Sequence, residues 1–156
     1  MKINILYASS HHKNTEKVAQ SMADVFEIKP KNFLYASEKD ITDSDIVGFG
    51  SGVYLAKFNQ IFIKVIKDIK PVSKKKAFIF STSGMGKNIL FNRSHKEIRK
   101  ILTKKGFDVV GEFNCPGFDT YSFLKFIGGI NKGRPNQKDL AAATEFARKI
   151  KVKYVK

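Results

Sequence analysis

The hydrophobic residues of this chain fall into short continuous runs, separated by longer segments in which they recur at helical spacing. The run at residues 46–50, Ile-Val-Gly-Phe-Gly, has no alternating polar positions, as expected of a parallel strand covered by helices on both faces. Runs of this length between turn residues predict strands. Five strands are predicted, at residues 3–7, 25–29 (ended by Pro30), 46–50, 77–80 and 107–113.

Helical spacing of the apolar residues predicts four helices between and after these strands. The first follows the polar turn after the first strand, and the second covers residues 62–69. Ser94 and Glu97 match a capping box, which predicts the start of the third helix, and Gly106 is placed to close it. Asn136 is the predicted N-cap of the last helix.

The alternation of five strands with helices predicts one fold class, a three-layer, doubly wound α/β sandwich with a five-stranded parallel sheet. Right-handed crossovers and a single domain over residues 1–156 are expected. Ligands of such sheets bind at the carboxyl ends of the strands, where the strand order reverses. Residues 8–15, 50–56 and 81–86 all lie at that edge. The connection over residues 114–135 is longer than compact domains usually need, so it is expected to be functional.

Residues 8–15 form a polar turn that ends at the N-terminus of the first predicted helix. Backbone N–H groups and the positive end of the helix dipole favour an anion there, and phosphate is the natural candidate. The alternative is that Asn14 or Thr15 only caps the helix and that the serines fill a turn. The turn matches neither G-x-G-x-x-G nor a G-K-[ST] ending, which favours a mononucleotide over a dinucleotide or ATP. The predicted anion-binding residues are Ser9, Ser10, His11, His12, Lys13, Asn14 and Thr15.

Composition narrows the class of protein. The 156 residues are 42% hydrophobic and include 14 Phe, which favours a globular domain over disorder. A single cysteine, Cys115, excludes an internal disulfide, and the lack of an export segment predicts a cytoplasmic protein without a membrane span. The three histidines have no carboxylate or cysteine at ligand spacing, so no metal site is predicted.

The formal net charge of +15 is spread along the chain and not confined to a tail. Such a charge attracts polyanions. The competing interpretation, lysine-rich solvated helix faces, is favoured because the chain has no recognised nucleic-acid motif. Specific nucleic-acid binding is therefore not predicted.

Three motifs together resemble those of the flavodoxin family: the hydroxyl-rich turn ending in Asn-Thr at a helix start, G-F-G-S-G-V-Y at residues 48–54, and S-T-S-G-M-G at residues 81–86. The later segments G-F-D-T-Y and G-G-I-N-K-G-R-P-N are similar to a branch of small single-domain members. The resemblance covers nearly the whole chain. It implies the strand order 2-1-3-4-5, bound flavin mononucleotide (FMN), and one-electron carriage between redox partner proteins.

Carried over to this chain, the resemblance implies that the opening turn holds the flavin phosphate. Tyr54 would stack on the isoalloxazine ring unless it is a core residue, and glycines would let backbone amides approach the ring. Cys115, Asp119 and Tyr121 would either close over the ring or form a structural loop. The implied ring contacts are Ser51, Gly52, Val53, Tyr54, Leu55, Ser83, Gly84, Met85 and Gly86.

Two departures from the family pattern affect these expectations. Lys13 stands directly before Asn-Thr, where the usual phosphate turn has glycine, so either the turn does not need positive φ there or flavin binding is weaker. The basic charge is the reverse of that of many flavodoxins and implies partners with an acidic docking surface. No catalytic acid or nucleophile is expected, because the cofactor performs the chemistry. A monomer or weak dimer is expected.

The main alternative to an electron carrier is an enzyme, an FMN-dependent NAD(P)H quinone or flavin-type reductase. Such an enzyme would need a substrate shelf over the ring and usually a dimer. Signalling receivers share the fold, but they need acidic residues where this chain has Tyr7-Ala8-Ser9 and Gly50-Ser51. A flavin-free basic domain that binds nucleic acid is a further alternative.

Overall fold

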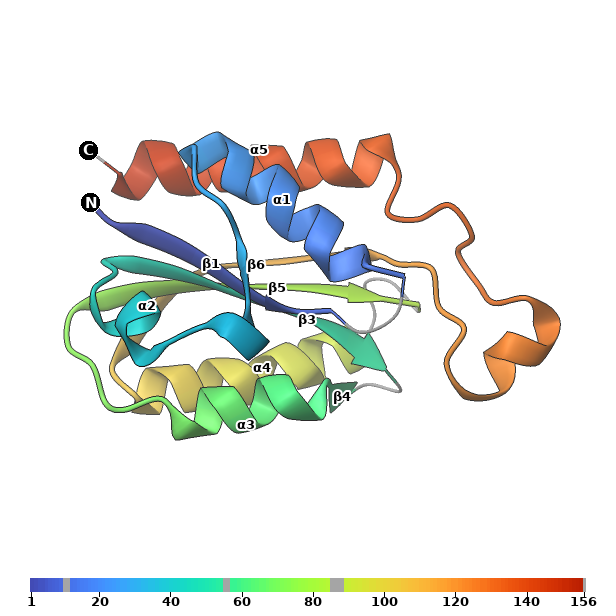
Figure 1. Ribbon diagram of the computed structural model, residues 1–156, viewed down its shortest axis with the longest axis horizontal. Helices are drawn as coiled ribbons and strands as arrows, with labels where there is room; N and C mark the ends of the chain where they lie inside the picture. The colour runs from blue at the N-terminus through green and yellow to red at the C-terminus, as the bar shows by residue number, and fades with distance from the viewer. Residues whose placement is uncertain (10–11, 55–56, 85–88, 156) are drawn as a thin grey trace.

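The computed structural model describes residues 1–9, 12–54, 57–84 and 89–155, which form a six-stranded sheet with helices on both faces (Figure 1). The strands are β1 (Ile3–Ala8), β2 (Lys31–Asn32), β3 (Ile46–Tyr54), β4 (Lys57–Phe58), β5 (Lys75–Ser83) and β6 (Phe107–Pro116). The helices are α1 (Asn14–Phe26), α2 (Glu38–Thr42), α3 (Gln60–Asp68), α4 (Ile89–Lys104) and α5 (Gln137–Tyr154), with the short 3-10 helices η1 (Phe33–Tyr35) and η2 (Ser122–Ile127).

The strand order is β2-β1-β3-β5-β6, and each of these neighbouring pairs is parallel. The short strand β4 pairs antiparallel with the end of β3. Counted over the parallel strands alone, this is the predicted order 2-1-3-4-5, so the predicted α/β sandwich is confirmed. The chain winds in opposite directions from β1, which makes the carboxyl ends of β1 and β3 the switch point of the sheet.

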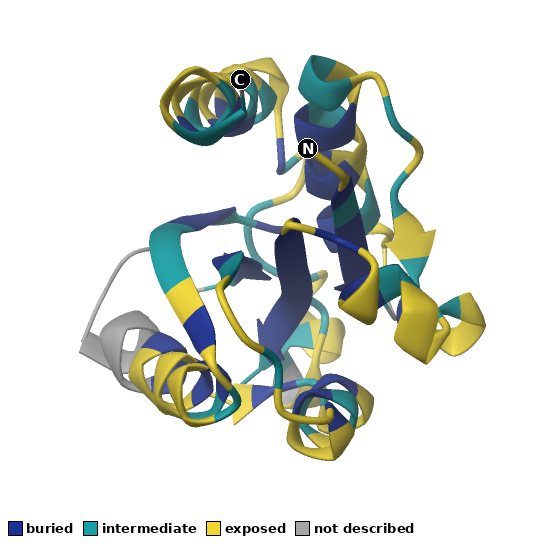
Figure 2. Cartoon of the chain, turned by 90° about the vertical axis from the view of Figure 1, so that its left-hand side faces the viewer, coloured by how far each residue is buried: buried dark blue, intermediate teal, exposed yellow. Residues whose placement is uncertain are grey.

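Helices α1 and α5 cover one face of the sheet, and α3 and α4 cover the other (Figures 1 and 2). Side chains alternate between the two faces along β5. Phe78 and Phe80 join the core beneath α1 and α5, whereas Ala77 and Ile79 join the core on the opposite face. The buried residues in Figure 2 accordingly lie along the sheet and on the inner sides of the helices.

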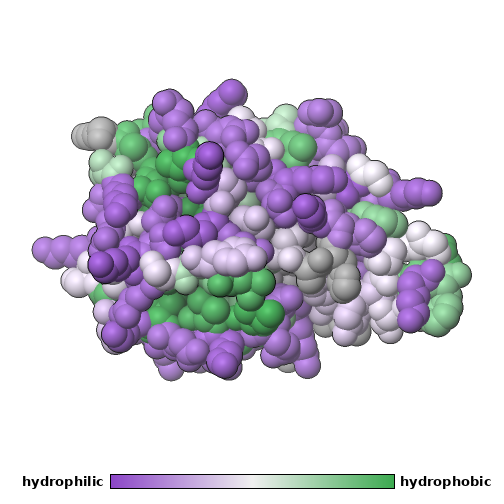
Figure 3. Space-filling view, in the orientation of Figure 1, coloured by the Kyte–Doolittle hydropathy of each residue, from purple (hydrophilic) through white to green (hydrophobic). Residues whose placement is uncertain are grey.

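Hydrophilic side chains cover most of the face shown in Figure 3, with an apolar patch over the region of η1 and α3. None of the helices in the described part of the chain is long and apolar enough to cross a membrane.

The strand predicted at residues 25–29 is wrong. Helix α1 continues to Phe26 and ends at Glu27, which has left-handed backbone angles, and β2 follows Pro30 instead. Val25 and Ile28 pack against the core on the α1–α5 face, so their apolar character serves helix packing. Tertiary packing thus outweighs the local β-propensity of this run.

The predicted start of the third helix is also wrong. Helix α4 begins at Ile89, and Ser94 is a buried residue inside it, so the Ser94–Glu97 spacing is not a capping box here. The other end is confirmed. Gly106 has φ +94° just beyond α4, and its N–H group donates to the carbonyl of Thr103. The predicted cap of the last helix is confirmed too, because the Asn136 side chain accepts from the backbone N–H of Asp139.

Strands β3 and β5 extend further than predicted, to Tyr54 and Ser83. Close packing between them explains the glycines in β3. A Cβ atom on Gly48 would lie 2.3 Å from the ring of Phe78, and one on Gly50 would lie 2.0 Å from the ring of Phe80. The segments predicted as loops after these strands therefore begin as paired strand ends.

Candidate cofactor site

The polar turn between β1 and α1 lies at the carboxyl edge of the sheet, and its backbone is left-handed. His12 has φ 58° and Lys13 has φ 53°, although neither is glycine. The interpretation that the turn avoids positive φ at Lys13 is therefore wrong. A left-handed conformation costs an L-residue about 1–2 kcal/mol, so the surrounding contacts must hold this turn in place.

Asn14 and Thr15 supply part of that support through their side chains. The Asn14 amide Nδ2 donates to the carbonyl of Phe118 at 2.7 Å, and Thr15 Oγ1 lies 2.9 Å from Thr82 Oγ1. Both side chains are buried and tie the turn to the strands behind it. The alternative that Asn14 or Thr15 caps the helix is wrong, because the N-cap is Lys13 and it makes no side-chain cap hydrogen bond. The predicted anion binding at this helix N-terminus would then rest on its backbone N–H groups.

The segment after β6 packs against the turn, a contact that the sequence analysis missed. His12 Nε2 lies 2.8 Å from Thr120 Oγ1, and the His12 ring centroid is 4.3 Å from that of Phe118. A Cβ atom on Gly117 would lie 2.8 Å from the Asn14 side chain, so glycine is needed there for close approach. The long connection predicted to be functional therefore forms one wall of the candidate site.

Tyr54 stands at the end of β3 and faces Tyr121 of this connection. The two ring centroids are 5.4 Å apart with an interplanar angle of 39°. Tyr54 is only partly buried and Tyr121 is 46% exposed, so the alternative that Tyr54 is a core residue is wrong. The pair forms an aromatic rim beside the strand ends.

Two glycines lie beneath this rim. A Cβ atom on Gly52 would lie 2.8 Å from the Tyr54 hydroxyl, and one on Gly84 would lie 2.6 Å from an Asp119 carboxylate oxygen. Larger residues at either position would displace these side chains. Both glycines are thus needed for close packing against protein side chains, and the approach of their amides to a flavin ring stays a prediction.

The cavity enclosed at this edge is small, with a volume of about 10 Å³. It brings together predicted residues from the opening turn, β3 and β5 with the segment that follows β6. Its lining consists of Asn14, Val53, Tyr54, Thr82, Ser83, Gly84, Gly117, Phe118 and Asp119. The described residues of the three predicted segments therefore converge, around a narrow space.

The remaining predicted residues have varied positions. Ser9 lies partly buried just after β1, while Ser51 is fully buried and donates to the carbonyl of Gly52. Cys115 is buried in the core beneath α1 and α5, so it does not close over this edge. Ser10, His11, Leu55, Met85 and Gly86 lie outside the described residues.

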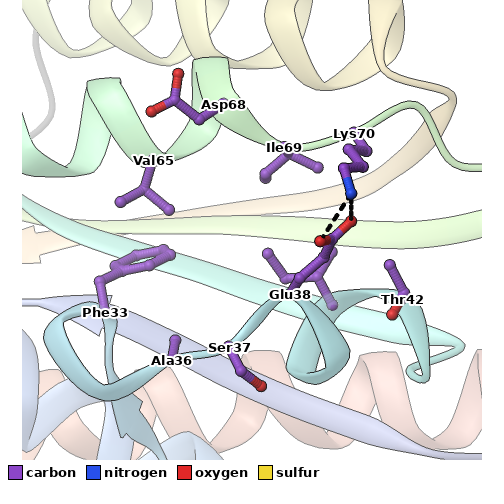
Figure 4. A pocket seen from close by; sticks show the side chains of 10 residues that line it. Phe33, Ala36, Ser37, Glu38, Thr42, Val65, Asp68, Ile69 and Lys70 are labelled. Carbon is purple, nitrogen blue, oxygen red and sulfur yellow. Dashed lines mark hydrogen bonds and ion pairs between the residues drawn. The ribbon is translucent and has the colours of Figure 1, made fainter.

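A larger hollow of about 220 Å³ lies elsewhere, between η1–α2 and α3 (Figure 4). Its lining is mainly apolar and includes Phe33, Val65 and Ile69, with the Glu38–Lys70 ion pair at its rim. It shares no residue with the strand-end cavity. It also lacks the glycines and the tyrosine pair of the candidate site, so we assign it no part in cofactor binding.

A chain of hydrogen-bonded polar groups, buried at Ser81, His95 and Asn114, runs from the end of β5 toward α4, and the sequence analysis missed it. Ser81 Oγ lies 2.8 Å from His95 Nε2, and His95 Nδ1 lies 3.2 Å from a carboxylate oxygen of Glu112. Arg99 pairs with the other oxygen of Glu112, and the Asn114 amide donates to Ser81 Oγ at 2.9 Å. These residues come from three separate elements, β5, α4 and β6, so no local spacing could have revealed the hydrogen-bond chain.

Burial and pairing shift the pKa values of His95 and Glu112 in this hydrogen-bond chain. Burial lowers the pKa of His95, and the hydrogen bond and charge of Glu112 offset this only in part. Burial raises the pKa of Glu112, but hydrogen bonds from His95 and Arg99, together with their charges, outweigh burial and lower that pKa to about 2. At neutral pH the hydrogen-bond chain therefore contains a neutral His95 imidazole and an ionised Glu112 carboxylate.

The chain is similar to known proteins in both sequence and fold. A flavodoxin domain matches residues 4–123. An uncharacterized protein of Methanocaldococcus jannaschii is 45% identical over 150 residues, which are 96% of this chain and 98% of the relative. The fold is similar to that of oxidised flavodoxin 1 from Bacillus cereus, with 16% identity, a TM-score of 0.75 and full coverage of both chains. An archaeal flavodoxin structure has 17% identity and a TM-score of 0.68, with 97% of this chain and 99% of the other covered.

Proposed function

The chain belongs to the flavodoxin domain family, and on that premise we propose that it binds FMN at the carboxyl edge of its sheet and carries electrons between redox partner proteins. The observation that carries the proposal is the convergence of the opening turn, the end of β3 and the end of β5 on one cavity. Bound FMN would supply the redox chemistry by accepting and releasing single electrons. The residues of the chain bind it, orient it and exclude water.

The phosphate would be held at the N-terminus of α1. Within the described residues, the first intrahelical N–H donor is that of Lys17, which bonds to the carbonyl of Lys13, and the N–H groups before it lie at the open end of the helix. The exposed Lys13 side chain adds a positive charge, and Ser9 adds a hydroxyl. Asn14 and Thr15, which are also predicted to contact the phosphate, fix the backbone of the turn through Phe118 and Thr82.

The flat ring would lie between Tyr54 and Tyr121. A ring inserted between two aromatic faces needs about 7 Å between them, because each contact spans about 3.5 Å. The present centroid separation is 5.4 Å, so one ring has to move. Tyr121 is the more exposed of the two and belongs to a connection rather than to the sheet, which makes it the side that opens.

The partner is proposed to have an acidic docking surface. Lys57 and Lys125 are exposed on the segments that border the site, and η2 adds Phe126 and Ile127, which are 80% and 67% exposed. In Figure 1, η2 projects beyond the carboxyl ends of β3 and β5. Apolar residues surrounded by lysines suit a partner whose apolar contact area is ringed by carboxylates.

The test is a titration of the purified protein with FMN, followed by the visible spectrum and by flavin fluorescence. The proposal predicts binding with a perturbed flavin spectrum. Tyr54→Ala should weaken binding by about fivefold to a hundredfold, since stacking on an aromatic side chain contributes about 1–3 kcal/mol. Tyr35→Ala is the matched control, because Tyr35 is an exposed tyrosine on η1 away from the cavity.

A colourless protein that takes up no FMN would contradict the proposal. Rapid reduction of the bound flavin by NADPH alone would instead favour the reductase alternative over an electron carrier.

A further inference from the structure

The buried hydrogen-bond chain that joins Asn114, Ser81, His95 and Glu112 has no role in holding FMN as proposed above. We propose that His95 is a proton-linked positioning residue. When His95 gains a proton, the donors and acceptors along the hydrogen-bond chain exchange roles, and the hydrogen bonds made by Ser83 at the cofactor site change. The effect on FMN rests on the proposed function, whereas the exchange of roles itself does not.

The direction of the chain with neutral His95 follows from its donors and acceptors. Asn114 Nδ2 can only donate, so Ser81 Oγ accepts from it at 2.9 Å and has its own proton left for His95 Nε2. Nε2 then acts as an acceptor, and the imidazole proton resides on Nδ1. From there it is donated to Glu112 at 3.2 Å.

A second proton on His95 makes Nε2 a donor as well. Ser81 Oγ must then accept from His95, and its hydroxyl proton needs a new acceptor. The described residues provide one nearby, since Asn114 Oδ1 is buried and makes no hydrogen bond with them. A half-turn of the Asn114 amide exchanges Nδ2 and Oδ1, which turns the amide from a donor to the Ser81 hydroxyl into an acceptor from it. It also breaks the 3.3 Å hydrogen bond from Nδ2 to the Ser81 carbonyl.

The same half-turn reaches the cofactor site. Asn114 Nδ2 also lies 3.3 Å from Ser83 Oγ, and Ser83 lines the strand-end cavity together with Thr82 and Gly84. When Oδ1 replaces Nδ2 at this place, Ser83 loses a donor and gains an acceptor. The hydroxyl at the edge of the candidate site therefore changes its hydrogen bonding with the proton state of His95.

The groups packed around His95 limit its protonation to two states, a neutral ring and a charged ring paired with Glu112. Its side chain is 1% exposed, and the Phe58 ring of β4 packs against it with centroids 5.3 Å apart. Among the described residues, the charged groups that act on it are Glu112 from β6 and Arg99 from its own helix, while β5 contributes the Ser81 hydroxyl. Glu112 remains ionised when His95 gains its proton, so the charged imidazole keeps a paired carboxylate. Because burial lowers the pKa of His95, the change is expected on the acid side of the usual histidine range.

The first experiment uses NMR on the protein without FMN. At pH 7 the proposal predicts a neutral His95 protonated on Nδ1. As the pH is lowered, the signals of the Asn114 side-chain amide should shift with the same midpoint as the His95 ring. Ser81→Ala removes the link and should abolish the Asn114 response, whereas Phe58→Leu, which alters packing against the ring but leaves the chain intact, should retain it. Titration of His95 without any change at Asn114 would overturn the proposal, and so would a His95 that stays neutral throughout the pH range of the folded state.

The second experiment measures the dissociation constant of FMN from about pH 5 to about pH 8. Titration of the FMN phosphate affects every variant alike, since its second pKa is about 6. The informative quantity is therefore the ratio between wild type and His95→Gln, which should change by about fivefold or more across this range. A constant ratio contradicts the proposed link. If the wild type binds no FMN, the proposed function fails, and the NMR experiment still decides whether the donors and acceptors exchange roles.

Discussion

Glu112 offers a sharp test of the electrostatics of the fold. Its side chain is 17% exposed and accepts hydrogen bonds from His95 and Arg99. These partners lower its pKa from 4.5 to about 2 in spite of burial. A carboxyl with a lowered pKa in the folded state stabilises the protein fully above the unfolded value and loses that contribution as the pH falls toward the folded value.

Glu112→Gln removes the charge and retains the shape and one acceptor oxygen. The lowered pKa corresponds to about 3 kcal/mol at neutral pH, an upper value because His95 is then uncharged and contributes only its hydrogen bond. We expect the free energy of unfolding of the variant to be about 1–3 kcal/mol lower at pH 7. For a chain of this length, this lowers Tm by about 3–10 °C.

The assay is urea unfolding at a series of pH values, with Glu145→Gln as the control. Glu145 is a half-exposed carboxylate that faces Arg148 at 3.9 Å, so its loss should cost less than about 0.5 kcal/mol. The difference between wild type and Glu112→Gln should shrink as the pH falls from 4.5 toward 2. A difference that is constant over this range, or absent at pH 7, would refute the reasoning.

Three further predictions concern the backbone and the surface charge. Gly106→Ala should destabilise the protein by about 2 kcal/mol or more, because its Cβ would lie 1.9 Å from the carbonyl oxygen of Val72 at φ +94°; unfolding at wild-type denaturant concentrations would contradict this. Lys13→Gly should raise the free energy of unfolding by up to about 1 kcal/mol by relieving a left-handed lysine, and a loss of stability would argue against that strain. The net charge of +15 should make the reduction potential for the second electron of bound FMN less negative as salt is removed, since screening acts within about 8 Å at physiological ionic strength. A reduction potential that does not change with salt would disprove this.

The fold class could be predicted from the sequence because its signals lie within short segments of the chain. Buried runs such as residues 46–50 exclude a one-sided sheet, and caps such as Asn136 and Gly106 depend on neighbours a few residues away. Errors arose where a local pattern had two interpretations. Val25 and Ile28 could belong to a strand or to the inner side of a helix. In the structure Val25 lies in α1 and Ile28 lies just beyond it, and both pack against the core.

The site was predicted in its parts but not in its contacts. Hydroxyl and glycine patterns identified the strand ends, since every such segment of a parallel sheet meets at one edge. The pairing of Tyr54 with Tyr121 and of Asn14 with Phe118 depends on how a long connection folds back, which no spacing along the chain records. The Ser81–His95–Glu112 chain was missed for the same reason, because it joins a strand, a helix and a second strand.

A crystal structure grown with excess FMN tests the central claim most directly. The account predicts the phosphate at the N-terminus of α1 beside Lys13, and the ring between Tyr54 and a displaced Tyr121. If the two tyrosines stay in contact and no flavin density is present at this edge, or if flavin binds elsewhere, the account is contradicted.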